Sequence, residues 1–187
     1  MREPLLEPLL RSLRIRRVLP CIRRHANCRL LDIGCGWEAR FLRSVEPYIA
    51  SGTGVDFKAP ELNTGKLRAI RLTLEDRLPF ADNSFDLVTM LAVLEHLVQP
   101  EAILREIHRV LVPGGELVLT VPTKAARPVL EFLAFRLGIV NREEIADHKT
   151  YYDRESLVAL MKLTGFTVME HRYFQFRMNN FCVAGCR

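Results

Sequence analysis

Leu-Leu-Asp-Ile-Gly-Cys-Gly-Trp-Glu, residues 30–38, is the most informative segment of the chain. A short apolar run ends in an acid, Asp32, and a Gly-x-Gly turn made by Gly34 and Gly36 follows at once. This order is typical of a first parallel strand that passes into a helix beside a nucleotide-like ligand, because glycines allow a tight turn and leave no Cβ to block the ligand. Asp32 would repel a pyrophosphate at this position, whereas a sulfonium amino acid would be attracted to it.

The size and composition of the chain predict one compact soluble domain. It has 187 residues, of which 49% are hydrophobic and 26% are charged, as in ordinary globular proteins. No apolar stretch reaches the length of a membrane-spanning helix, and the N-terminus lacks the apolar core of a signal peptide, so we expect a cytoplasmic protein. The five cysteines follow no zinc-binding spacing, which indicates reduced thiols and no metal site.

Residues 1–27 form a basic segment that we expect to cap the domain. Arginines gather there against only two acids, Glu3 and Glu7, and leucines interleave with them. Such a basic amphipathic segment could contact an anionic membrane surface, a phosphorylated substrate or nucleic acid. We favour a solvated helix packed on the domain, since runs of charge usually form exposed faces.

Apolar runs and helical patterns then alternate along the chain. This alternation predicts an α/β fold, a doubly wound Rossmann-like sheet that is mostly parallel and has helices on both faces. The expected strands are 30–33, 52–57, 68–74, 85–91 and 116–121, and the expected helices are 39–45, 101–111 and 153–163. Two further strands, 166–174 and 180–185, have no helix between them, so we expect an antiparallel C-terminal hairpin.

A dinucleotide site is one interpretation of the glycine turn. Gly34-x-Gly36-x-x-Ala39 fits the loose dinucleotide pattern, and Asp56 lies about twenty residues further on, as such sites require. Asp32 argues against it, and the chain lacks room for a second nucleotide half together with a substrate domain. We therefore treat this interpretation as the weaker one.

Five motifs follow one another in order, and together they are far more specific than any one alone. They resemble the class I S-adenosylmethionine-dependent methyltransferases, in the branch called methyltransferase type 11, closely over residues 28–122 and more loosely in the tail. The motifs are Leu-Asp-Ile-Gly-Cys-Gly (31–36), Gly-Val-Asp-Phe (54–57), Leu-Pro-Phe-Ala-Asp-Asn-Ser-Phe-Asp-Leu-Val (78–88), Val-Leu-Glu-His-Leu (93–97) and Arg-Val-Leu-Val-Pro-Gly-Gly-Glu-Leu (109–117).

The resemblance implies that S-adenosylmethionine is the cofactor and assigns its contacts. The acid of the first motif would serve the methionine ammonium, the acid of the second would hold the ribose, and the end of the fourth strand would lie near the transferring methyl group. The implied cofactor-binding residues are Asp32, Gly34, Gly36, Asp56, Phe57, Leu74, Glu75 and Leu91. Two departures affect the turn and the adenine edge, since Glu38 replaces a common third glycine and Thr73 or Leu74 replaces a common acid.

Methyl transfer from a sulfonium is an in-line displacement, which needs positioning and exclusion of water rather than a metal or a covalent nucleophile. If the acceptor is a hydroxyl or a protonated amine, a nearby base would help. His96, just after the fourth strand, is the candidate catalytic residue. It could equally be a structural residue of the Glu-His-Leu turn, because one histidine near a site is a weak catalytic signal.

The acceptor is expected to contact an insertion at about residues 124–152, within the single methyltransferase domain 28–187. Its apolar part is typical of ordinary packing, whereas His148, Tyr151 and Tyr152 offer hydrogen-bonding side chains on a connection and are the predicted substrate contacts. We expect a small-molecule acceptor. The alternatives are an RNA methyltransferase, for which no RNA-binding module is visible, and a non-catalytic S-adenosylmethionine-binding protein.

Overall fold

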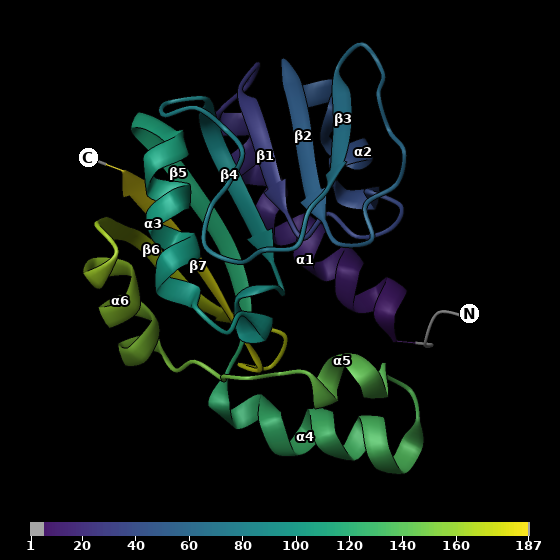
Figure 1. Ribbon diagram of the computed structural model, residues 1–187. Helices are drawn as coiled ribbons and strands as arrows, with labels where there is room; N and C mark the ends of the chain where they lie inside the picture. The colour runs from purple at the N-terminus through teal and green to yellow at the C-terminus, as the bar shows by residue number, and fades with distance from the viewer. Residues whose placement is uncertain (1–5, 187) are drawn as a thin grey trace.

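A computed structural model describes residues 6–186, which build one seven-stranded sheet between two layers of helices (Figure 1). The strand order is β3-β2-β1-β4-β5-β7-β6. Strand β7 runs antiparallel to both β5 and β6, and the other neighbours are parallel. The predicted fold class and the antiparallel hairpin are confirmed. The strands are β1 Arg29–Ile33, β2 Ser51–Asp56, β3 Leu67–Arg71, β4 Phe85–Leu91, β5 Leu111–Pro122, β6 Phe166–Phe174 and β7 Asn179–Cys186.

Helices cover both faces of the sheet, and two more lie beyond the carboxyl ends of the central strands (Figure 1). One face carries α3 and α6 and the other carries α1 and α2; the insertion holds α4 and α5. The α-helices are α1 Glu7–Arg24, α2 Arg40–Val45, α3 Pro100–Val110, α4 Arg127–Phe132, α5 Arg142–Ala146 and α6 Arg154–Leu163. The 3₁₀ turns are Glu46–Tyr48, Leu94–His96 and Lys124–Ala126, and a π-helical turn, Leu133–Leu137, continues α4.

The two-sided packing explains why the central strands are apolar runs rather than alternating ones. In β1, Leu31 and Ile33 belong to the core under α3 and α6, while Leu30 belongs to the core under α1 and α2. All three side chains are fully buried. Only Asp32 interrupts this run, so the sheet has one buried carboxyl group near the end of β1.

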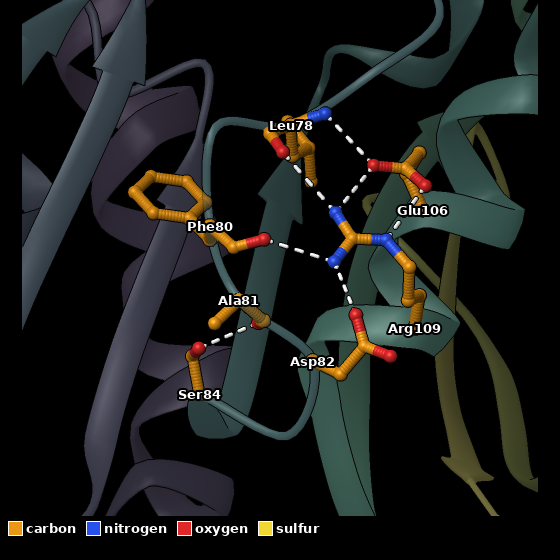
Figure 2. A network of polar contacts seen from close by, with 7 residues as sticks. All are labelled: Leu78, Phe80, Ala81, Asp82, Ser84, Glu106 and Arg109. Carbon is orange, nitrogen blue, oxygen red and sulfur yellow. Dashed lines mark hydrogen bonds and ion pairs between the residues drawn. The ribbon is translucent and has the colours of Figure 1, made fainter.

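Arg109, near the end of α3, holds the loop that leads into β4 (Figure 2). Its Nη1 donates to the carbonyl of Phe80 at 2.9 Å and to Asp82 Oδ1 at 2.6 Å. Its Nη2 donates to the carbonyl of Leu78 at 3.1 Å and to Glu106 Oε2 at 2.6 Å. Because the planar guanidinium has donors in a fixed fork, one side chain orients the whole loop against α3.

The element boundaries differ from the sequence predictions by more than one residue in two strands, β3 and β5, and the other expected strands and helices agree within one residue at each end. Strand β3 ends at Arg71 rather than at residue 74, and Leu72 accordingly leaves the sheet at its carboxyl edge. Strand β5 begins at Leu111 and includes Pro113, where the pairing with β4 shifts its register. Proline lacks a backbone N–H, so a strand accepts it where the ladder is already irregular.

Helix α1 is packed on the sheet rather than extended away from it. Val18, Cys21 and Ile22 are buried in the core shared with α2, and the Arg17 guanidinium lies 4.8 Å from the ring centroid of Phe181 in β7. The expected cap at residues 1–27 therefore corresponds to a packed helix over Glu7–Arg24, and its first five residues lie outside the described part. None of the helices within residues 6–186 is long and apolar enough to cross a membrane.

Candidate functional site

A cavity of about 770 Å³ opens at the carboxyl ends of β1, β2 and β4. This edge is where the strand order reverses, between β1 and β4, which is the usual ligand position in an open α/β sheet. Its lining includes the glycine turn, the ends of β2 and β4, the N-terminal half of α1, and the insertion that carries α5.

The two glycines of the turn differ in what surrounds them. Both adopt left-handed backbone angles, with φ of +78° at Gly34 and +71° at Gly36. A Cβ on Gly34 would lie 2.2 Å from Val93 Cγ2, whereas one on Gly36 would meet nothing within 4 Å. Gly34 therefore allows close packing against the segment after β4, and Gly36 leaves open space beside the cavity.

Glu38, which stands where a third glycine is common, forms an ion pair with Arg40 and lines the cavity. The next residue, Ala39, takes a left-handed φ of +50°. Helix α2 consequently begins at Arg40 without a side-chain cap. The turn thus reaches the helix through a strained alanine instead of a glycine.

Asp32 is a buried acid whose proton affinity is high. It is 2% exposed and its Oδ1 accepts a hydrogen bond of 2.7 Å from the Thr89 hydroxyl on β4. Burial raises the pKa of Asp32 to about 7, the Thr89 hydrogen bond opposes this rise, and the nearby charge of Asp56 adds to it. A bound cation would therefore favour the ionised form at neutral pH.

Asp56, at the end of β2, is oriented by backbone donors. Its Oδ2 accepts from the Gly36 amide at 3.0 Å and its Oδ1 accepts from the Lys58 amide at 2.7 Å. Each carboxylate oxygen keeps a further lone pair for a ligand. The next residue, Phe57, is 61% exposed, and the Lys58 ammonium lies 4.8 Å from its ring centroid.

Most of the predicted cofactor residues share this cavity. Glu75 lies outside its lining and borders a neighbouring hollow of about 520 Å³, which Leu74 borders as well. The predicted residues in the lining of the main cavity are Asp32, Gly34, Gly36, Asp56, Phe57, Leu74 and Leu91.

A polar cluster closes the same cavity on the side of the insertion. His96 Nδ1 lies 3.1 Å from Asp147 Oδ2, and because a carboxylate only accepts, this nitrogen carries the proton. The His96 ring meets the His148 ring edge to face, with centroids 4.8 Å apart. His148 Nδ1 in turn lies 2.9 Å from the Tyr151 hydroxyl. The structure thus brings the predicted catalytic residue next to one predicted substrate contact.

Two groups of this cluster have pKa values far from their usual range. Burial lowers the pKa of His148 to about 4, the neighbouring His96 lowers it further, and Asp147 opposes both. Glu95 is 1% exposed. Burial raises its pKa to about 8, while its own backbone amide and the charge of Arg14 oppose the rise. Near neutral pH, His148 is therefore uncharged and Glu95 holds a proton much of the time.

The predicted tyrosines lie away from the cavity lining. Tyr151 contacts His148 through its hydroxyl group. Tyr152 is 5% exposed and belongs to the core under α3 and α6. The Tyr152 carbonyl accepts a 2.8 Å hydrogen bond from Asn180. Sequence reasoning did not single out Arg14 or Asp147, because nothing local marks a contact between segments so far apart in the chain.

Comparison with known proteins settles the family. A family model described as a methyltransferase domain matches residues 6–171. The chain belongs to this family. The resemblance seen in the sequence motifs is thereby confirmed, and the pairing of a glycine turn with acids at the ends of β1 and β2 is its structural counterpart.

The relatives with known roles include methyltransferases of quinone biosynthesis. The chain is 31% identical over 157 residues to the ubiquinone/menaquinone biosynthesis C-methyltransferase UbiE of Neisseria meningitidis. The aligned region covers 75% of the chain and 64% of that protein. The chain is 34% identical over 131 residues to the ubiquinone biosynthesis O-methyltransferase of Xanthomonas oryzae, covering 65% of the chain and 52% of that protein. The chain thus spans less than two thirds of these relatives.

Solved structures share the fold. The complex between the Haloferax volcanii Trm112 methyltransferase activator and a methyltransferase contains a chain that matches with a TM-score of 0.72, covering 100% of this chain and 99% of that one. The sequence identity is 17%, so this likeness speaks for the fold alone.

Proposed function

We propose that the chain binds S-adenosylmethionine in the 770 Å³ cavity and transfers its methyl group to a small-molecule acceptor. The observation that carries this proposal is the pair of acids, buried Asp32 and amide-bound Asp56, on either side of a glycine turn with open space at Gly36. Family membership and the related methyltransferases support it.

The residues present fit this cofactor better than a dinucleotide. The buried carboxyl of Asp32 suits the positively charged methionine end, and Asp56 offers acceptor oxygens to two ribose hydroxyls. A pyrophosphate at the same turn would face the carboxyl group of Asp32, and like charges at close range are unfavourable. The site thus has the opposite charge preference from a phosphate-binding turn.

When bound, S-adenosylmethionine supplies a methyl group on a positively charged sulfur. The chain contributes binding and orientation through the glycine turn and its two acids, and α1 and the insertion, which line the cavity, would exclude water from it. His96 lies at the acceptor end, with Nδ1 bonded to Asp147. Its Nε2 is therefore the nitrogen available to take a proton from a hydroxyl or amine acceptor.

Calorimetric titration with S-adenosylhomocysteine and, separately, with NAD tests the cofactor. We expect one S-adenosylhomocysteine to bind per chain and NAD to give no heat. Binding of NAD alone would overturn the proposal. Formation of S-adenosylhomocysteine from S-adenosylmethionine, measured against a panel of quinone and phenol acceptors, then distinguishes an enzyme from a protein that binds the cofactor without turnover.

A further inference from the structure

We propose that Glu95, His96 and His148 form a binding site for a divalent transition-metal ion at the acceptor end of the cavity. Each residue offers one ligand atom, and these atoms all lie within 4.8 Å of one another. All three residues also line the cavity that contains Asp32 and the glycine turn.

The hydrogen bonds of the two histidines leave the correct nitrogens for a metal. His96 Nδ1 is bonded to Asp147 and His148 Nδ1 to the Tyr151 hydroxyl, so Nε2 is the available atom on both rings. Metal-ligating histidines almost always have their other nitrogen held in this way, by a carboxylate or another polar group, because the contact fixes the ring orientation.

Glu95 provides the second, independent observation. Its side chain is 1% exposed, and its Oε2 has no hydrogen-bond partner within the described residues. A buried oxygen without a partner is costly and calls for an explanation. A metal ion beside the two imidazoles would satisfy it.

The backbone holds the three ligands together. The amide of Lys149, which follows His148, donates to the Glu95 carbonyl at 2.7 Å, and the amide of Thr150 donates to the same oxygen at 3.3 Å. The insertion is thereby fastened to the 3₁₀ turn after β4, so the ligands come from two segments that are tied by hydrogen bonds rather than from one mobile loop.

The donor set indicates the class of ion. Two imidazole nitrogens and one carboxylate suit Zn²⁺ and the related ions Fe²⁺, Ni²⁺ and Cu²⁺ better than the hard ions Ca²⁺, Mg²⁺ and Mn²⁺. Zn²⁺ binds such atoms at about 2.0–2.2 Å, so the ligands would move slightly toward one another on binding. Asp147 and Glu144 add negative charge around the cluster, and Arg14 is the cation that competes for Glu95.

Such a site has open coordination positions toward the cavity, as catalytic zinc sites do. This role rests on the proposed methyl transfer and selects acceptors with a hydroxyl group. The ion would lower the pKa of that hydroxyl, whose proton passes to solvent. The oxygen then bonds to the methyl carbon while the electron pair of the carbon–sulfur bond stays on sulfur. In the metal-loaded protein this replaces direct proton transfer to His96.

Calorimetry with Zn²⁺ on tag-free protein dialysed against EDTA tests the site. We expect one ion per chain, with affinity reduced at least about 10-fold in both His148→Ala and Glu95→Gln. Asp147→Asn, which removes the charge beside His96 and the ion pair with Lys149, should weaken binding by about 10- to 100-fold. His25→Gln removes a histidine outside the cavity and should bind Zn²⁺ as the unmodified protein does.

Two further measurements separate this proposal from its alternatives. Co²⁺ bound at the site should show visible absorption without a thiolate charge-transfer band; such a band would assign the ion to the cysteines and overturn the proposal. Far-ultraviolet circular dichroism must show that each variant is folded. If S-adenosylhomocysteine binds the EDTA-treated protein and Zn²⁺ does not, the metal site is wrong and the proposed function stands. If only Zn²⁺ binds, the metal site stands and the cofactor assignment is wrong.

Discussion

Asp32 and Asp56 are both aspartates at strand ends, yet their surroundings give them different properties. Asp32 is buried with one hydroxyl donor, whereas Asp56 accepts two backbone amide hydrogen bonds at the cavity. The sequence predicted a ligand-facing position for both, from their places after apolar runs. It could not predict the raised pKa of Asp32, which depends on burial by chain segments far away in sequence.

The first prediction concerns the pH dependence of cofactor binding. If ionised Asp32 binds the positively charged methionine end, affinity for S-adenosylhomocysteine should rise as pH increases through about 7. The ionised fraction grows about 10-fold between about pH 6 and about pH 8, and affinity should follow it. Calorimetry across this range measures the slope. Asp32→Asn should give weaker binding with a flat profile, and a flat profile in the unmodified protein would contradict the assignment.

The raised pKa of Asp32 also predicts that the free energy of unfolding falls as pH increases, whereas the affinity for the cofactor rises. Because folding raises the pKa of Asp32, the protonated form favours the folded state, and this contribution is complete below about pH 4 and is lost as pH rises through about 7. At pH 8, Asp32→Asn should therefore have a larger free energy of unfolding than the unmodified protein, by up to about 4 kcal/mol. Urea denaturation at acidic and alkaline pH measures the difference, which should vanish at the acidic end.

Asp56→Asn tests the ribose assignment. The substitution keeps the shape and one acceptor oxygen but removes the charge, so it should weaken S-adenosylhomocysteine by about 1.5–3 kcal/mol. Titration calorimetry at fixed pH and salt gives the value. Asp82→Asn is the matched control, since Asp82 pairs with Arg109 outside the cavity. Equal affinities in the two variants would rule out a ribose contact at Asp56.

Among the elements, the turn between β1 and α2 shows why two glycines with similar φ angles are not equivalent. An alanine with left-handed backbone angles costs about 1–2 kcal/mol of stability. Gly34→Ala should lower the free energy of unfolding by more than this, because its Cβ would lie 2.2 Å from Val93 Cγ2. Gly36→Ala has no such contact and should show the strain alone, together with weaker cofactor binding. Urea denaturation of both variants measures the contrast. Val93→Ala in the Gly34→Ala background should recover part of the loss, and no recovery would exclude the steric explanation.

Helix α1 is expected to fold together with the sheet as one cooperative unit. Ile22 is fully buried in the core shared with α2 and the sheet, so Ile22→Ala should lower the free energy of unfolding by about 2–5 kcal/mol. Leu9→Ala, at a position 55% exposed on the same helix, should change it by less than about 1 kcal/mol. A small effect at Ile22 in chemical denaturation would mean that α1 folds separately from the sheet.

The elements themselves could largely be predicted from the sequence. Strands β4 and β6 begin and end at the predicted residues, and turn residues mark where each begins, Asn83-Ser84 before β4 and Gly165 before β6. The apolar pattern predicts a strand that continues past Arg71, where β3 ends. The additional apolar residues, Leu72 and Leu74, lie after the strand and pack against the core there. Periodicity detects burial, and burial outside the ladder is easily mistaken for strand.

At the scale of the whole molecule, the sequence could not predict which distant segments contact one another in the fold. The cysteine spacing indicated no metal site, yet the fold places His148 of the insertion beside Glu95 and His96 after β4. No local pattern encodes this contact, because the path of the insertion depends on how it packs across the carboxyl edge of the sheet. The edge itself was predictable, since parallel strands direct their ends to one side.

The assembled cavity predicts which parts of the chain respond to the cofactor. Helix α1 and helix α5 both line it, together with the glycine turn, although they lie far apart in the sequence (Figure 1). Binding of S-adenosylhomocysteine should therefore slow amide hydrogen exchange in the N-terminal half of α1 and in Arg142–Ala146, because ligand binding makes local opening less favourable. Strand β6, at the far edge of the sheet, is the internal reference and should change little. Protection confined to the glycine turn would show that α1 and the insertion do not close over the ligand, and the site would then be an open groove.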